Sequence, residues 1–174
     1  MQRTARTTGF AYLALALTGM LGFLVVRPRL YVDGDPAATL QHLVEDSTLA
    51  HLGVGVELLI VATQALAALC FYRLFASVNR AAAVGVLGFG LMNTVAIMAS
   101  ATFMATAVGV ADDPALAPGG DPAATIALLA ALSTNAWGTG AVFFGLWLIP
   151  MGWVAVSSGR MPRVSRYPII QSSP

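Results

Sequence analysis

The sequence is poor in charged residues and in cysteine. Only 10% of its 174 residues are charged, whereas charged residues make up about 25% of an average soluble domain. Eight acidic residues and nine basic ones, the latter all arginine, are too few to cover a soluble surface, so we expect most of the surface to contact lipid. The single cysteine excludes an internal disulfide framework and any site with several thiolate ligands. The net charge of +1 leaves no basic surface for nucleic acid.

The motifs of common enzyme classes are also missing. The sequence has no Gly-Lys-Ser/Thr phosphate loop, no His-Glu-x-x-His metal motif and no Gly-x-Ser-x-Gly nucleophile motif. His42 and His51 are nine residues apart, which would put them on opposite faces of a helix and disfavours a shared metal or haem. We expect no catalytic residues, no metal and no cofactor. A non-catalytic role is favoured, and the question of enzymatic activity stays open.

The sequence does contain long runs without charge. Runs of twenty, thirty-one and thirty-eight uncharged residues follow Arg6, Arg80 and Asp121. A further run of twenty-six after Asp46 is interrupted only by Glu57. A helix needs about 20 apolar residues to cross a bilayer, and the runs show no strand-like alternation. We therefore predict an all-α integral membrane four-helix bundle with short outer-face helices in the connections. It forms a single transmembrane domain over residues 1–158, with spans at 8–26, 52–72, 82–105 and 136–156 and a flexible cytoplasmic tail at 159–174.

Arginine is distributed unevenly between the two ends of these spans. Seven arginines fall on one side and two on the other, where aspartate and glutamate outnumber them. Arginine-rich connections stay in the cytoplasm, so we predict a multi-pass protein of the bacterial inner (plasma) membrane with cytoplasmic N and C termini. The first run also has features of a secretory signal peptide. It ends at Arg27-Pro28-Arg29 rather than at a cleavage site of small residues, so we expect it to be retained.

The hexapeptide Gly-Asp-Pro-Ala-Ala-Thr occurs twice, at residues 34–39 and 120–125. Aspartate caps helix N-termini and proline favours the first helical position, so each copy predicts a helix start on the outer face. The first helix is amphipathic, with Leu40, Leu43 and Val44 on one face, and suits the membrane interface. The second is apolar all round and should pack on the bundle or merge with the fourth span. Shared local chemistry and duplication of half the bundle both explain the repeat.

Three polar residues fall inside the predicted spans. Glu57 lies about 9 Å below the outer end of the second helix, and Gln64 follows seven residues later on the same face. Asn93 should lie at a similar depth on the third helix. These residues are the candidates for an intramembrane polar seam. Alternatively, the two amides hold helices together by hydrogen bonds of about 0.6–2 kcal/mol, and Glu57 is protonated or paired with threonine or arginine.

Two function hypotheses remain open at this point. In the first, the protein is a non-catalytic binding or assembly protein, either a homo-oligomer or part of a larger membrane complex. In the second, it is a small transporter or a membrane-embedded sensor that uses Glu57, Gln64 and Asn93. The lipid bilayer is a partner in both, nucleic acid in neither, and the identity of a small-molecule ligand is unknown.

Several segments resemble those of an uncharacterised bacterial integral-membrane family, "domain of unknown function 4386". They are residues 6–19, 34–39, 72–80 and, most specifically, Phe143-Phe144-Gly145-Leu146-Trp147-Leu148-Ile149-Pro150-Met151-Gly152, followed by Ser158-Gly159 and Pro162-Arg163. The resemblance implies a multi-spanning membrane protein without assigned activity, so it supplies no site residues. Members of the family continue after the Pro-Arg into further membrane helices, whereas the residues after Arg163 cannot span. The chain therefore resembles either a shortened or frame-shifted member of the family or a natural four-helix variant of it.

Overall fold

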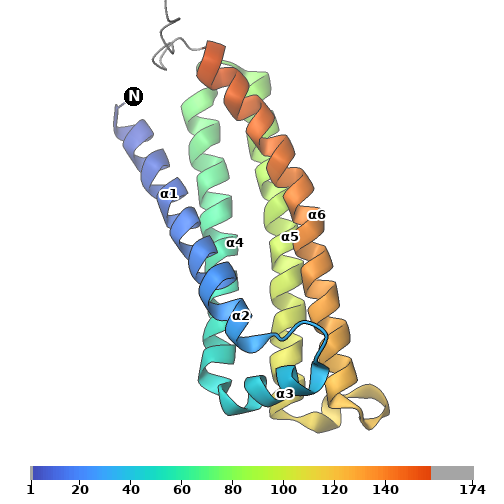
Figure 1. The fold of residues 1–174 in the computed structure, drawn as a ribbon. Helices are drawn as coiled ribbons and strands as arrows, with labels where there is room; N and C mark the ends of the chain where they lie inside the picture. The colour runs from blue at the N-terminus through green and yellow to red at the C-terminus, as the bar shows by residue number, and fades with distance from the viewer. Residues whose placement is uncertain (1, 158–174) are drawn as a thin grey trace, which may run out of the picture.

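Long helices lie side by side in an antiparallel bundle in the computed structural model, which describes residues 2–157 (Figure 1). The first comprises α1 (Gln2–Met20), the π-helical turn η1 (Leu21–Val26) and α2 (Arg27–Leu30). The others are α4 (Ser47–Phe75), α5 (Arg80–Asp112) and α6 (Pro122–Ser157). Within residues 2–157, four helices are long and apolar enough to cross a membrane, and each is longer than the span predicted for it. The protein is an all-α membrane bundle, as the uncharged runs predicted.

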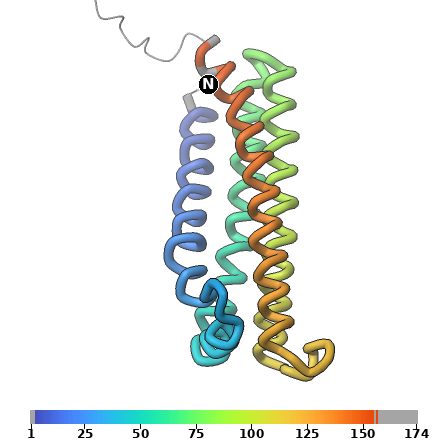
Figure 2. The backbone as a smooth tube through the Cα atoms, turned by 45° about the vertical axis from the view of Figure 1, so that its right-hand side comes forward, coloured from blue at the N-terminus to red at the C-terminus, as the bar shows by residue number. Residues whose placement is uncertain are grey.

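The two ends of the described chain lie at one end of the bundle. Figure 2 shows the start of α1 and the end of α6 at the same end of the bundle, with α3 (Pro36–Glu45) at the opposite end. This arrangement follows from an even number of crossings. We refer to the α3 end as the outer end. The predicted tail, 159–174, lies outside the described residues.

Both copies of the hexapeptide build the same helix cap. The carboxylate of Asp35 accepts a hydrogen bond of 2.9 Å from the backbone N–H of Ala38 at the start of α3. The carboxylate of Asp121 accepts an equivalent bond, also of 2.9 Å, from Ala124 at the start of α6. The glycine before each aspartate has a positive φ of 74–75°, a conformation that glycine adopts at low cost. The two copies therefore share one local structure, which both explanations of the repeat predict.

The two copies differ in the helix that each cap begins. The first starts α3, a separate helix that crosses the outer end of the bundle with Leu43 fully buried. Val44, predicted to share the apolar face, is 53% exposed. The second copy starts α6, which continues unbroken into the fourth span, so the merged alternative is the one observed. The third connection contains two 3₁₀ turns, η2 (Pro114–Leu116) and η3 (Pro118–Gly120).

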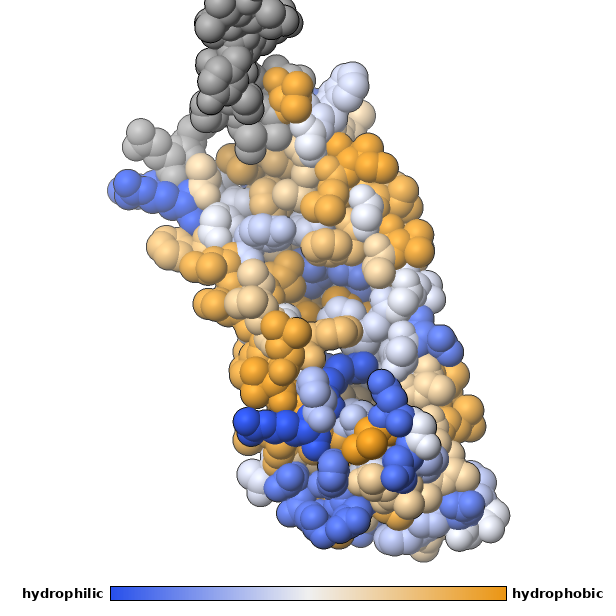
Figure 3. Space-filling model, in the orientation of Figure 1, coloured by the Kyte–Doolittle hydropathy of each residue, from blue (hydrophilic) through white to orange (hydrophobic). Residues whose placement is uncertain are grey.

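The long helices pack in the order α1, α4, α5, α6, each against the next. Helix α1 packs on α4, helix α6 packs along α5, and α4 packs on α5, while the backbones of α1 and α6 stay apart (Figures 1 and 2). Small residues allow the close approach between α4, α5 and α6. A Cβ atom at Gly90 would lie 2.7 Å from the Cβ of Ala68 and 3.2 Å from the indole nitrogen of Trp147. The face between α1 and α6 is hollowed, with hydrophilic residues among hydrophobic ones (Figure 3).

Candidate functional site

Arg27 points into the bundle rather than into the outer connection. The helix continues through Arg27 to Leu30, and the Nη2 atom of Arg27 lies 2.8 Å from Oε1 of Glu57 on α4. The Nε atom donates a second hydrogen bond of 3.1 Å to the same oxygen. The side chain of Glu57 is 3% exposed and that of Arg27 is 17% exposed. The charge at Glu57 therefore has a partner on another helix.

The wide turn η1 leads directly into Arg27. Its backbone N–H bonds the carbonyl of Gly22, five residues earlier, instead of the usual four. Pro28 comes next, and a proline inside a helix lacks a donor and crowds the carbonyl four residues before it. A π turn relieves that crowding and rotates the side chains beyond it. The local sequence thus accounts for a change of helical face next to Arg27.

Polar side chains from α5 and α6 complete the surroundings of the ion pair. Ser100 on α5 lies 3.0 Å from Nη2 of Arg27 and 3.4 Å from each carboxylate oxygen of Glu57. Ser133 on α6 accepts a hydrogen bond from Arg27 and lies 2.7 Å from the Ser100 hydroxyl. The indole N–H of Trp137, also on α6, donates to Glu57 at 3.1 Å. We call these five residues the Arg27–Glu57 cluster.

The cluster connects the four long helices of the described chain in the outer half of the bundle. A charged side chain at the centre of a membrane helix costs roughly 2.5–3.5 kcal/mol on insertion scales. A buried charge is tolerated when it is paired and its remaining lone pairs are hydrogen-bonded. Here the first helix supplies the cation, α4 the anion, and α5 and α6 the hydroxyl and indole groups. Removal of either charge would leave the other without its ionic partner.

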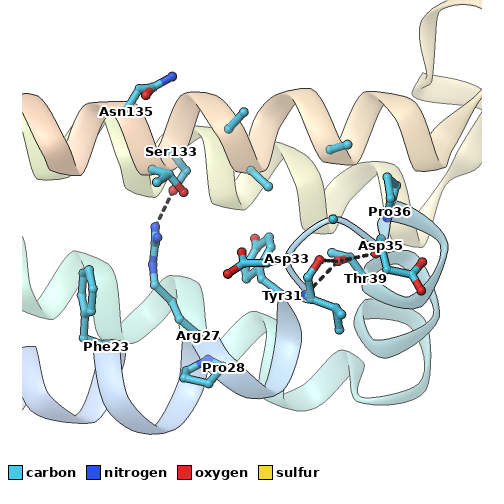
Figure 4. Close-up of a pocket in the computed structure, with 16 residues that line it drawn as sticks. Phe23, Arg27, Pro28, Tyr31, Asp33, Asp35, Pro36, Thr39, Ser133 and Asn135 are labelled. Atoms are coloured by element: carbon cyan, nitrogen blue, oxygen red, sulfur yellow. Dashed lines mark hydrogen bonds between the residues drawn. The ribbon is translucent and has the colours of Figure 1, made fainter.

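A pocket of about 730 Å³ lies beside the cluster at the outer end. Its wall contains Arg27 and Ser133, and the chain that leaves α2 contributes Tyr31, Asp33 and Asp35 (Figure 4). The Tyr31 hydroxyl is buried and has no hydrogen-bond partner among the described residues. Burial raises the pKa of Tyr31 to about 12; the positive charge of Arg27 opposes this shift and the negative charge of Glu57 adds to it. Tyr31 therefore remains a neutral donor at physiological pH. We call this the outer pocket.

A second pocket, of about 390 Å³, lies nearer the middle of the bundle. All four long helices line it, and its polar residues include Gln64 and Asn93, which are 1% and 4% exposed. The amide nitrogen of Gln64 is buried and has no acceptor among the described residues. Leaving such a donor unpaired costs about 1–3 kcal/mol. We call this the inner pocket.

Aromatic side chains separate the two pockets. Phe23, which lines the outer pocket, meets Trp137, which lines the inner one, edge to face with ring centroids 4.9 Å apart. The Arg27 guanidinium lies 5.6 Å from the centroid of Phe23 and 5.9 Å from that of Trp137. These contacts fix the indole that also donates to Glu57. The Arg27–Glu57 cluster and the inner pocket therefore share one side chain, that of Trp137.

The predicted polar seam is thus divided between two places. Glu57 belongs to the outer cluster, whereas Gln64 and Asn93 line the inner pocket, and none of the pockets described here is lined by all three. Sequence reasoning missed Arg27, Ser100 and Ser133. The spacing of polar residues could have identified Ser100. Gln64 lies seven residues after Glu57 on α4, and Ser100 lies seven residues after Asn93 on α5. Because α4 and α5 are antiparallel, these equal spacings give two polar layers. One contains Glu57 and Ser100, and the other contains Gln64 and Asn93.

The histidines lie outside both layers. The Nε2 atom of His51 is 3.3 Å from a carboxylate oxygen of Asp112 at the exposed outer end. His42 lies on α3 and is half-buried. Within residues 2–157, no three histidine, cysteine, aspartate or glutamate side chains come together as metal ligands.

Sequence comparison places these features in a family. The family model described as "Domain of unknown function (DUF4386)" matches residues 7–167, nearly the whole chain. The chain belongs to the DUF4386 family. No curated protein and no solved structure matches it. For this DUF4386 protein, function must therefore be argued from the cluster and the pockets.

The ion pair predicts unequal effects of removing its two charges. Glu57→Gln should lower the free energy of unfolding by about 3 kcal/mol, because arginine cannot lose its proton and stays charged without a partner. Arg27→Met should cost less, because a buried carboxyl group can be neutral whereas a guanidinium cannot. The double variant should lose less than the sum of the two single losses. Equilibrium unfolding in detergent measures all three.

Arg29→Met is the matched control, because Arg29 is exposed two residues further along α2. It should change stability by less than about 0.5 kcal/mol. Additive losses in the double variant, or an Arg29→Met loss as large as that of Arg27→Met, would contradict the pairing.

Proposed function

We propose that this DUF4386 protein is a non-catalytic binding protein of the cell membrane, and that its ligand occupies the outer pocket. The observation that carries the proposal is the buried, unpartnered hydroxyl of Tyr31 in a pocket of about 730 Å³ beside the fixed guanidinium of Arg27. Small-molecule sites typically occupy about 300–1,000 Å³ and contain a few placed polar groups. Tyr31 offers a donor to a ligand, and the Arg27–Glu57 cluster holds the wall in place.

The charges around the pocket favour a neutral or zwitterionic polar group. The positive charge of Arg27 is already paired with the carboxylate of Glu57, whose Oε1 atom lies 2.8 Å from Nη2 of Arg27. Asp33 and Asp35 line the pocket and are exposed, so its surface carries excess negative charge. An anionic group would be repelled, whereas an ammonium group is attracted to the two aspartates and an oxygen acceptor can receive the Tyr31 hydrogen bond. A zwitterionic lipid headgroup has both features.

The proposal places the outer pocket on the non-cytoplasmic side. Arg73 and Arg80 flank the connection between α4 and α5, whereas the outer connections are rich in acidic residues. This asymmetry supports an orientation in the plasma membrane of a bacterium with both chain ends cytoplasmic. The ligand would then enter from the outer leaflet or from the space beyond it.

Lipid retention tests the proposed binding site. Purified protein should retain phosphatidylethanolamine over phosphatidylglycerol in native mass spectrometry, by about tenfold. Tyr31→Phe should reduce the retained phosphatidylethanolamine about fivefold, which corresponds to the loss of one hydrogen bond of about 1 kcal/mol. Asp33→Asn should reduce the preference between the two lipids.

Tyr72→Phe is the control, because Tyr72 lies near the inner end of α4 and lines neither pocket. It should retain lipid as the wild type does. Equal retention of both lipids together with no effect of Tyr31→Phe would refute a zwitterionic ligand in the outer pocket.

Labelling of single cysteines tests the orientation. Cys70, the only cysteine of the sequence, is buried and would be replaced by alanine. In intact cells, a membrane-impermeant maleimide should label Asp113→Cys but leave Ser77→Cys unlabelled. Both positions are exposed, so Ser77→Cys should react once the membrane is opened. The opposite pattern in intact cells would invert the proposed topology.

Transport or sensing through Glu57, Gln64 and Asn93 remains the alternative hypothesis, and assembly with a partner remains a further one. The outer pocket supports binding more directly, because Glu57 is held by Arg27 and Trp137 and lines neither the outer nor the inner pocket. Proton-coupled uptake into vesicles that depends on Glu57 would favour transport.

A further inference from the structure

We propose that the inner pocket binds a neutral lipophile that carries a carbonyl group on a flat ring, of the quinone class. The inference rests on the proposed binding function and adds a second site with a different ligand chemistry. Its basis is the juxtaposition of an unpaired buried amide donor, aromatic walls and a position near the middle of the membrane.

The unpaired donor calls for an acceptor on the ligand. The Gln64 side chain is 1% exposed and is one of the residues that line the pocket, and its buried amide nitrogen has no acceptor among the described residues. Asn93 lines the same pocket and forms no side-chain hydrogen bond with the described residues. A Cβ atom at Gly140 of α6 would lie 2.8 Å from the Oδ1 atom of Asn93, so the missing side chain at Gly140 leaves room for the Asn93 amide. A carbonyl oxygen is the simplest acceptor that satisfies Gln64.

The other walls favour a flat and uncharged ligand. Tyr12, Trp137 and Phe144 line the pocket together with aliphatic residues such as Leu15, Ile60 and Ile97. No arginine, aspartate or glutamate lines it. Aromatic rings bind other flat rings by stacked or edge-to-face contacts. A charged group would have no partner here, whereas a neutral ring with a carbonyl matches both the walls and the amide.

The depth of the amides separates this ligand from a bilayer phospholipid. Gln64 lies three residues, roughly 4.5 Å, from the midpoint of α4, and Asn93 lies three residues from the midpoint of α5. Each amide lies on the side of its helix midpoint that is farther from the outer end. Gln64 and Asn93 therefore lie at the same depth, near the bilayer centre. The ester carbonyls of phospholipids lie in the interfacial region, outside the hydrocarbon core of about 30 Å. A lipophile dissolved in the hydrocarbon reaches this depth with its carbonyl.

The separation between α1 and α6 provides a route of entry. Their backbones stay apart, and the face between them is hollowed where hydrophilic residues lie among hydrophobic ones (Figures 1 and 3). Ala16 and Gly19 of α1 and Ala141 of α6 line the pocket with small side chains. A ligand can therefore enter from the lipid phase between these helices without crossing the outer pocket.

Menadione and methylnaphthalene form a matched pair of probes, because they share a methylated naphthalene ring system and only menadione carries carbonyls. We expect wild-type protein in lipid nanodiscs to bind menadione saturably, about tenfold tighter than methylnaphthalene, after partition into empty nanodiscs is subtracted. Gln64→Met keeps the side-chain volume and removes the donor, so it should abolish this tenfold preference. Ala141→Leu keeps Gln64 and fills the pocket, so it should weaken the binding of both probes.

Val142→Leu is the control for Ala141→Leu, because Val142 is 62% exposed and lies outside the pocket. It should bind both probes as the wild type does. Equal affinity of wild type for the two probes, or an unchanged preference in a folded Gln64→Met variant, would overturn the proposal. A Gln64-dependent preference for ester-linked over ether-linked phospholipid, without a menadione preference, would assign the donor to a bilayer lipid and also overturn it.

Tyr31→Phe separates this proposal from the outer-pocket function. It should leave menadione binding unchanged, since Tyr31 does not line the inner pocket. Equal retention of the two lipids by the wild type, with no effect of Tyr31→Phe, would refute the proposed function alone if the menadione preference and its dependence on Gln64 persist. Lipid retention that depends on Tyr31, together with equal binding of menadione and methylnaphthalene, would refute the inner site alone.

Discussion

The ion pair between Arg27 and Glu57 is the interaction on which the outer half of the bundle depends. It links the first helix to α4 at 2.8 Å, and Ser100, Ser133 and Trp137 extend it to α5 and α6. In hydrocarbon, apolar contacts between helices gain little over contacts with lipid, so polar contacts and close packing hold helices together. The pair also fixes one wall of the outer pocket.

The fold followed from the sequence because two physical constraints act over long stretches of chain. Backbone groups in lipid must be hydrogen-bonded within a helix, so uncharged runs of sufficient length predict the spans. Asp35 and Asp121 predicted helix starts because capping is a local property. The continuation of α6 from its cap into the fourth span is also local, since its residues are apolar all round. Family membership, inferred from segments such as 143–152, agrees with the match over residues 7–167.

The site was only partly predictable because its partners meet through tertiary structure. Glu57 was identified as an unusual intramembrane charge, and arginine was one of the partners considered. The prediction nevertheless ended the first span at residue 26, which placed Arg27 in the outer connection. A π turn before Pro28 extends the helix and brings the guanidinium inward. Gln64 and Asn93 were singled out as polar residues inside the spans and both are buried, but the equal spacing that separates them from Glu57 and Ser100 was not used.

The central claim is that Glu57 is an ionised partner of Arg27 within the membrane bundle. Infrared difference spectroscopy tests it most directly, by comparing wild-type protein with folded Glu57→Gln in the same detergent at neutral pH. The account predicts that the carboxylate stretching bands of one glutamate disappear in the variant. Loss of a protonated carboxyl C=O stretch instead would show that Glu57 is neutral and would contradict the ion pair.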